Sequence, residues 1–523
     1  MGKNILIFSD GTGQVGGLRP DQRLSNIYKL YRASRVSPEN CIDPDRQIAF
    51  YDAGLGTSDT DQPFWVRPIS FIRRALASAT GTGLGRNMVE CYSFIIEHWE
   101  PGDRIYLFGF SRGGYTIRCL SNALSLCGVP TIDGNRAPLR RRGPLATKIA
   151  EEAVYSVYDH ASGRATDEQR VERAELARRF RTKYSSYDPD HPDRSNAIPY
   201  FIGAFDAVAA LGLRTSHRIL AISVAALFAF LAAWLVSYPI TAIGRWLSGI
   251  MQFDVPVITA TASPLLLASL VFTVAVLIAA YRWLPAHRKV IHNYPQPGPS
   301  RSHWLWFRMN AADSDTRLEP RVGYARHAMA IDERRALFPR AKWGGKHLEE
   351  VPPSERVDFV QMWFAGNHSD IGGSYPEHES RLSDIPLQWM VDEMSKLPFP
   401  VDLDRSKLNL FPRADGLQHC EVRAVKEASW VRRLFPWKED ERYTASGARH
   451  HPTVEERFAM KRASLLGELG PYRPKSLIYD ARWGPICQEA HQECLPSDFA
   501  ERWSAVVNPK DCALRPTSVM AVR

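Results

Sequence analysis

The chain has 523 residues, of which 45% are hydrophobic and 24% charged, and a formal net charge of +9. This balance is ordinary for a globular protein and excludes disorder on a large scale, because enough apolar side chains are present to bury a core. The positive charge favours anionic surroundings, namely lipid headgroups, nucleic acid or acidic substrates, and does not choose among them.

Short apolar runs alternate with helix-like stretches in the first part of the chain. The pattern predicts strands at residues 4–8, 48–51, 104–109 and 201–205, and helices at residues 24–32, 85–99 and 114–126. Strands that alternate with helices are typical of a mostly parallel sheet with helices on both faces. The sequence therefore predicts an α/β fold.

Two uncharged apolar stretches interrupt this pattern, at residues 219–240 and 264–280. Each approaches or reaches the roughly 20 residues that a helix needs to cross a bilayer. Basic residues flank the outer ends, whereas the connection holds only Arg245 and Asp254. By the positive-inside rule, both outer flanks should then lie in the cytoplasm.

These stretches predict an inserted transmembrane hairpin over residues 214–290, with spans at about 219–240 and 264–284. The expected location is a bacterial inner membrane, crossed twice, with the catalytic domain in the cytoplasm. The alternative interpretation is a pair of buried core helices.

After the hairpin, residues 357–366 predict another strand, followed by a glycine-rich loop and a helix over residues 386–396. We therefore divide the chain into four parts. Residues 1–213 and 291–400 are the two halves of one α/β domain, residues 214–290 are the hairpin, and residues 401–523 are a C-terminal extension that packs on the domain.

Residues 109–113 read Gly-Phe-Ser-Arg-Gly and centre on Ser111. A strand before and a helix after a Gly-x-Ser-x-Gly motif is the context of the nucleophile elbow in α/β-hydrolases. The glycines allow the sharp turn, and the helix N-terminus helps to stabilise an oxyanion. Ser111 is therefore the candidate nucleophile.

A serine nucleophile needs a general base and a carboxylate that orients the base. In α/β-hydrolases the chain order is serine, acid, histidine, with the acid and histidine after later strands. Asp206 follows the strand at residues 201–205, and His368 follows the strand at residues 357–366. The alternative roles are a helix cap for Asp206 and loop stabilisation for His368. Asp370 is an alternative acid, although a role in turning the loop is favoured.

Several motifs occur together across much of the first 395 residues. They include Phe-Ser-Asp-Gly-Thr at residues 8–12 and segments at residues 25–28, 51–57, 109–118, 203–208, 330–335 and 363–375. In combination they resemble the α/β-hydrolase family typified by type VI secretion phospholipase effectors of the first lipase group. The chain departs from that family in having Gly114 where alanine is usual, and in the hairpin.

This resemblance implies an esterase fold with Ser111, Asp206 and His368 as the catalytic triad, and a phospholipase A-like or related lipid-ester activity. A further familiar segment, His-Pro-Thr-Val at residues 451–454, makes His451 the alternative base.

The oxyanion donors are expected beside the nucleophile. One is the amide of Arg112, the residue after Ser111. The resemblance implies that the loop containing Gly11 and Thr12 borders the site and supplies the second donor. No cofactor is expected. The G-x-G-x-x-G run that starts at Gly11 should open directly into a helix, but Pro20 interrupts there and no suitable acid follows. No ligand spacing suggests a metal.

We therefore expect a membrane-anchored serine hydrolase that cleaves a carboxylic ester, with a phospholipid or lysophospholipid as substrate. The alternative is a non-catalytic, membrane-anchored binding or scaffold protein that uses the hydrolase fold. The expected partners are the lipid bilayer and the ester substrate, without nucleic acid. The sequence indicates no oligomeric state. Its eight cysteines contain no C-x-x-C pair and predict reduced thiols.

Overall fold

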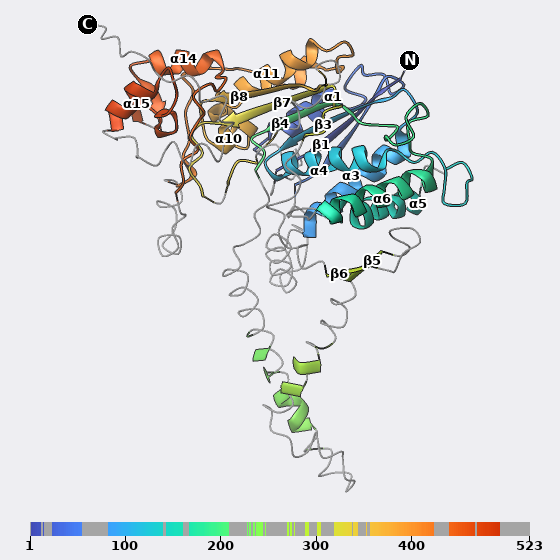
Figure 1. Ribbon diagram of the computed structural model, residues 1–523. Helices are drawn as coiled ribbons and strands as arrows, with labels where there is room; N and C mark the ends of the chain where they lie inside the picture. The colour runs from blue at the N-terminus through green and yellow to red at the C-terminus, as the bar shows by residue number, and fades with distance from the viewer. Residues whose placement is uncertain are drawn as a thin grey trace.

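A computed structural model describes most of the α/β part of the chain. The described residues are 2–11, 14, 23–54, 82–139, 143–160, 167–208, 318–336, 338–341, 343, 352, 356–422, 439–465 and 468–491, with short pieces between 227 and 304. A central sheet lies between helices on its two faces (Figure 1).

Six strands form this sheet, and every neighbouring pair is parallel. Their spatial order reverses at β1, which has β2 on one side and β3 on the other. In open α/β sheets, ligands bind at the carboxyl ends of the strands where the order reverses. The spatial order is β2 (Gln47–Asp52), β1 (Asn4–Ser9), β3 (Arg104–Phe110), β4 (Pro199–Phe205), β7 (Tyr324–Ala330), β8 (Asp358–Phe364).

Alternate side chains of each strand point to opposite faces of the sheet and enter two different cores. In β1, Ile5 and Ile7 pack against one layer of helices, whereas Leu6 and Phe8 pack against the other. The first layer contains α3 (Thr82–His98), α4 (Arg112–Cys127), α5 (Pro144–Glu151), the π-helix η1 (Glu152–Tyr158) and α6 (Asp167–Tyr184). The second contains α1 (Asn26–Ser34) and α11 (Asp384–Ser395).

The predicted mostly parallel sheet with helices on both faces is confirmed, and the predicted elements differ from the structure by only a few residues at their ends. β7 is a strand that the sequence analysis missed, because Arg326 and His327 interrupt its apolar run. In the structure Arg326 forms ion pairs with Asp358 and Glu393. His327 is fully buried, and its Nε2 accepts a hydrogen bond from Ala207 N at 3.2 Å.

The predicted transmembrane hairpin is wrong. Among the residues that the structure describes, no helix has both the length and the apolar character that a bilayer crossing requires. Much of residues 219–240 and 264–284 lies outside the described residues.

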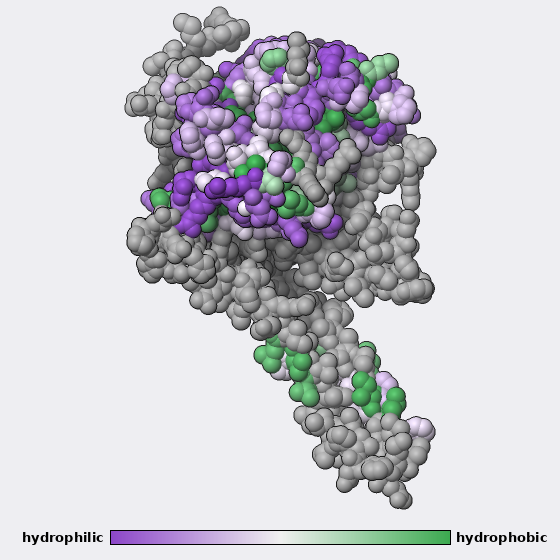
Figure 2. Space-filling view, turned by 90° about the vertical axis from the view of Figure 1, so that its right-hand side faces the viewer, coloured by the Kyte–Doolittle hydropathy of each residue, from purple (hydrophilic) through white to green (hydrophobic). Residues whose placement is uncertain are grey.

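The localisation predicted from the hairpin, a two-span protein of the bacterial inner membrane, is overturned by the same finding. Several described side chains in this stretch are apolar and exposed, among them Leu235 and Trp246, and apolar residues of this stretch are green in Figure 2. Hydropathy therefore identified an apolar stretch correctly. Hydropathy records composition and does not by itself establish a membrane-spanning helix.

Residues 439–465 and 468–491, called the C-terminal residues below, pack on the edge of the sheet that carries β8. Trp363 of β8 and Met329 of β7 share a core with Val454, Phe458 and other side chains from the C-terminal residues. The helices there are α14 (Pro452–Ala459) and α15 (Gly484–His491), with a short hairpin of β9 (Ala463–Leu465) and β10 (Glu468–Gly470). A second short pair, β5 (Arg288–Ile291) and β6 (Arg301–Trp304), lies away from the sheet (Figure 1).

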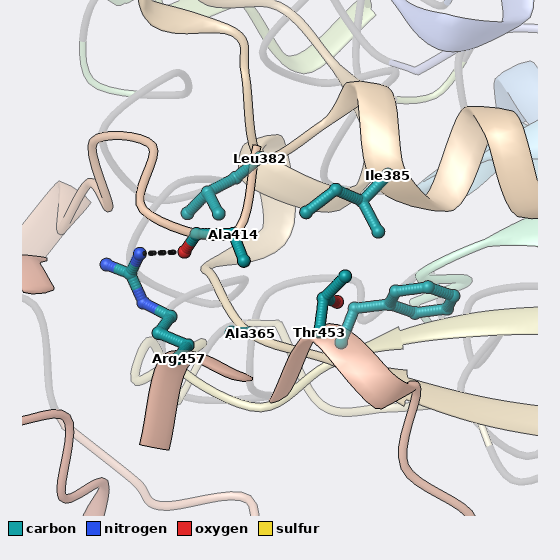
Figure 3. A pocket seen from close by; sticks show the side chains of 7 residues that line it. Ala365, Leu382, Ile385, Ala414, Thr453 and Arg457 are labelled. Carbon is teal, nitrogen blue, oxygen red and sulfur yellow. Dashed lines mark hydrogen bonds between the residues drawn. The ribbon is translucent and has the colours of Figure 1, made fainter. Parts of the chain in front are cut away.

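Close packing around α14 leaves only a small space, shown in Figure 3. The guanidinium of Arg457 lies at its edge and donates to the carbonyl of Ala414 at 2.6 Å. The lining residues are Phe364, Ala365, Leu382, Ile385, Ala414, Thr453 and Arg457. The C-terminal residues thus form part of the same packed body as the sheet.

Candidate active site

Ser111 lies in the turn between β3 and α4, as the elbow motif predicts. Its φ of 57° is in the left-handed region, which residues other than glycine rarely adopt. Its amide donates to the carbonyl of Phe205 at 3.1 Å. A Cβ added at Gly113 would lie 2.0 Å from the carbonyl oxygen of Ser9, and one at Gly109 would lie 2.5 Å from the carbonyl oxygen of Gly113. The turn therefore requires both glycines.

Asp206 follows the last residue of β4 and is fully buried. Like Ser111, it has a positive φ, here 37°. Its Oδ1 accepts a hydrogen bond from the amide of Ala330 at 3.1 Å, and its Oδ2 lies 2.5 Å from Nδ1 of His368. Strained backbone of this kind is found at functional sites more often than elsewhere.

His368 is the first residue of α10 (His368–Gly372), just after β8. Its imidazole lies against the rings of Phe110 and Phe338, with centroids 4.7 and 5.1 Å away. Its amide donates to Oε2 of Glu333 at 3.2 Å. Nε2 is buried and forms no hydrogen bond, including none to the hydroxyl of Ser111. The structure thus brings Asp206 and His368 into contact and places His368 against Phe110, the residue before Ser111.

The charges around this pair favour an anionic aspartate and a neutral histidine. Burial alone would raise the pKa of Asp206, but the Arg442 guanidinium and the hydrogen bond from His368 hold it well below its ordinary value. Burial lowers the pKa of His368 below its usual 6.5 despite the neighbouring carboxylate. A neutral His368 beside an anionic Asp206 can act as a general base and accept a proton at neutral pH.

The expected oxyanion donors have different environments. Arg112 is the first residue of α4, and the first amides of a helix have no partner within the helix. Gly11 lies beside the nucleophile, since a Cβ added to it would lie 3.4 Å from Cβ of Ser111. Its amide, however, donates to Oδ1 of Asp10 at 2.7 Å. Thr12 lies outside the described residues.

The two alternative residues have other contacts. His451 is the N-cap of α14, where Nδ1 accepts from the hydroxyl of Thr453 at 2.9 Å, and its ring stacks on Phe364. Burial lowers its pKa to about 4. Asp370 completes the capping box of α10 and accepts a hydrogen bond from Nδ1 of His419 at 2.7 Å. Neither is bonded to Asp206 or His368.

Arg442 is a residue at this site that the sequence analysis missed. Its Nη1 lies 2.7 Å from Oδ1 and 2.9 Å from Oδ2 of Asp206. It comes from the C-terminal residues, where no motif marks it. Glu333 and Phe338 were not predicted as site residues either, although both contact His368.

A separate cavity of about 430 Å³ lies between the loop after β7 and the C-terminal residues. Arg334, Arg473 and Lys475 contribute to its lining, whereas Ser111, Asp206 and His368 do not. It is therefore distinct from the site described above. The described residues contain no group of three or more His, Cys, Asp or Glu side chains that could hold a metal ion.

Comparison with known proteins adds a family. The family described as "T6SS, Phospholipase effector Tle1-like, catalytic domain" matches residues 3–236 and 293–393. The uncharacterised protein YEL023C of Saccharomyces cerevisiae is 35% identical over 131 residues, which are 24% of this chain and 18% of the yeast protein. The match therefore spans less than a fifth of that relative.

Two solved structures are distantly similar. One is an uncharacterised protein from Pseudomonas aeruginosa, with 14% identity and a TM-score of 0.31 over 79% of this chain and 49% of the other. The second is the Tle1 effector bound to the VgrG spike of the type 6 secretion system, with 16% identity and a TM-score of 0.25 over 73% and 53%. Scores this low support no inference about this chain.

Proposed function

Because the chain belongs to the family of type VI secretion phospholipase effector Tle1-like catalytic domains, we propose that it hydrolyses a carboxylic ester of a phospholipid or lysophospholipid. The observation that carries this proposal is the contact of 2.5 Å between Asp206 and Nδ1 of His368, with Nε2 of the same ring buried and unbonded. Nε2 is therefore available to accept the proton of a nucleophile.

The proposed mechanism uses Ser111, His368 and Asp206 as one unit. Nε2 of His368 takes the proton of the Ser111 hydroxyl while Oγ attacks the ester carbonyl. The imidazolium then gives that proton to the leaving alcohol, and the acyl group stays on Oγ. A water molecule, deprotonated by the same nitrogen, releases the acid and restores the serine.

Two features of the chain support these roles. The positive φ of Ser111 is the strained turn that presents a nucleophile at the top of a sheet. The amide of Arg112 at the start of α4 supplies one donor to the oxyanion. The Ser111–His368 hydrogen bond is absent here, and catalytic hydrogen bonds often tighten only in the substrate complex.

The experiment compares purified wild-type protein with Ser111→Ala, using a fluorophosphonate probe and phosphatidylcholine vesicles. We expect wild-type protein to react covalently with the probe and to release fatty acid, and Ser111→Ala to do neither. Ser125→Ala is the matched control, because Ser125 lies on the same α4 and its hydroxyl only donates to Ser121. Equal labelling of Ser111→Ala would assign the nucleophile elsewhere. A wild-type protein that neither reacts nor hydrolyses would favour a non-catalytic binding protein.

A further inference from the structure

Arg442 lies against the buried carboxylate of Asp206. Nη1 is within 2.9 Å of both carboxylate oxygens, and Nη2 donates to the carbonyl of Phe338 at 2.5 Å. The side chain of Asp206 is 0% exposed and that of Arg442 only 9%. Because water is largely excluded, this ion pair is far less screened than a pair on the surface.

The backbone around Arg442 fixes where its guanidinium lies. The backbone of Glu439 forms an isolated antiparallel β-bridge with that of Arg335, and the amide of Asp440 donates to the carbonyl of Arg334 at 2.9 Å. The guanidinium of Arg334 in turn pairs with Glu441 at 2.9 Å. The loop after β7 and the segment at residues 439–442 thus hold each other, and the same loop supplies Glu333 and Phe338 to His368.

Asp206 needs a cation at this position. Its oxygens accept hydrogen bonds from Ala330 and His368, which are both uncharged donors when the imidazole is neutral. Burial of an ionised carboxylate without a positive partner is strongly unfavourable, and such a group normally takes up a proton instead. A protonated Asp206 would no longer stabilise the imidazolium that forms on His368.

We propose that Arg442 is a positioning residue for the catalytic pair, and that its guanidinium keeps Asp206 ionised and oriented toward His368. This inference rests on the proposed ester hydrolysis. Arg442 lies outside residues 3–236 and 293–393, which match the family. The C-terminal residues therefore complete the active site as well as packing on the sheet.

The test is removal of the guanidinium followed by its return from solution. In Arg442→Ala we expect kcat on a short-chain p-nitrophenyl ester to fall by about a hundredfold with KM within about twofold of wild type, because the side chain acts on the transition state through Asp206. Guanidinium or ethylguanidinium chloride at tens of millimolar should restore at least a tenth of the lost kcat, whereas ethylammonium should restore less. Restoration by a small cation is an effect that a merely structural role would not produce.

Arg473→Ala is the matched control. Arg473 also belongs to the C-terminal residues and is partly buried, and its Nη1 donates to the carbonyls of Phe458 and Tyr472 rather than to Asp206. We expect Arg473→Ala to lower the melting temperature, with kcat within twofold of wild type and no response to guanidinium.

Three results separate the possible failures. A folded Arg442→Ala with wild-type kcat, or with a low kcat that guanidinium leaves unchanged, overturns the role of Arg442. If Arg442→Ala does not fold, Arg442→Gln, which has a long uncharged side chain, is subjected to the same rescue and judged by the same criteria. Absence of hydrolysis and of Ser111 labelling in wild type would instead reject the proposed function.

Discussion

At the residue scale, His368 and His451 differ in what their ring nitrogens contact. Nδ1 of His368 lies 2.5 Å from a buried carboxylate, which fixes the tautomer and leaves the other nitrogen free to exchange a proton. Nδ1 of His451 accepts from Thr453 at the start of α14 and serves as a helix cap. The first arrangement suits a general base, and the second stabilises a helix.

This difference leads to a pair of substitutions. Asparagine caps helices well, so His451→Asn should keep both the fold and kcat close to wild type. His368→Asn should lower kcat by on the order of a thousandfold, because members of a triad act as a unit. Both variants are measured for ester hydrolysis and melting temperature. Normal turnover in His368→Asn with loss in His451→Asn would assign the base to His451.

The sequence could predict Ser111, Asp206 and His368 as candidates because each lies in the turn, loop or short helix that follows a strand of a parallel sheet. The carboxyl ends of such strands meet at one edge, so chain position alone indicates proximity. Arg442 has no such signal. It approaches Asp206 through irregular backbone pairing between Glu439 and Arg335, which no periodicity reports.

At the element scale, Arg457 connects α14 by hydrogen bonds to residues 414–416 and to β9. It is fully buried, and its guanidinium donates to the carbonyls of Ala414, Gly416 and Ser464 at 2.6 to 3.0 Å. The carbonyl of Ser464 also accepts from the amide of Gln418 at 3.1 Å. Ala414 and Gly416 lie outside helices and strands, so their carbonyls depend on this side chain. α14 was not predicted, because its first turn is set by a histidine cap and a proline rather than by an amphipathic run.

Arg457→Met should therefore weaken the fold more than its loss of charge suggests. Methionine fills a similar volume but leaves the carbonyls of Ala414 and Gly416 without this donor, and an unsatisfied buried acceptor costs about 1–3 kcal/mol. We expect the free energy of unfolding in urea to fall by about 3–5 kcal/mol. Arg413→Met is the control, since Arg413 is exposed and pairs only with nearby Asp415. A change below about 1 kcal/mol in Arg457→Met would show that water replaces the guanidinium.

At the scale of the whole molecule, the sequence predicted the sheet but not the core that the C-terminal residues form with β8. Alternation of strands and helices was sufficient for the α/β layers, since both faces of each strand must be covered. The apolar stretch at residues 219–240 suggested a membrane span because hydropathy records composition, which does not by itself establish a spanning helix. The core shared by Trp363 and Phe458 joins positions far apart in sequence, so local patterns could not reveal it.

Some buried carboxylates bond to no cation among the residues that the structure describes, and they make the stability of the whole fold depend on pH. Asp52, at the end of β2, accepts hydrogen bonds from Ser9 and Asn87 at 2.8 and 2.9 Å, and burial raises its pKa to about 7. Burial likewise raises the pKa of Asp10 to about 6 and that of Asp332 to about 7. An unfolded aspartate has a pKa of about 3.9, so the folded protein retains protons that the unfolded chain has released.

The sign for Asp52 follows from this difference. Between pH 4 and pH 7 the folded state binds more protons at this site than the unfolded state, so its contribution to stability falls as pH rises. Buried neutral histidines such as His327, whose pKa burial lowers to about 3, act in the opposite direction below pH 6.5. The net profile of the wild type therefore mixes both signs. A difference between two variants isolates one group.

We predict that Asp52→Asn becomes more stable relative to wild type as pH rises. At pH 5 the wild-type Asp52 is largely protonated, and the two proteins should have similar free energies of unfolding in urea. At pH 8 the wild type must bury a charge that asparagine lacks, so the variant should gain about 2–4 kcal/mol relative to it. All other groups titrate alike in both proteins and cancel. Asp45→Asn, at an exposed position just before β2, should differ from wild type by the same amount at both pH values. If Asp52→Asn shows the same constant difference, Asp52 is ionised in the fold at pH 5 and its burial does not control the pH dependence.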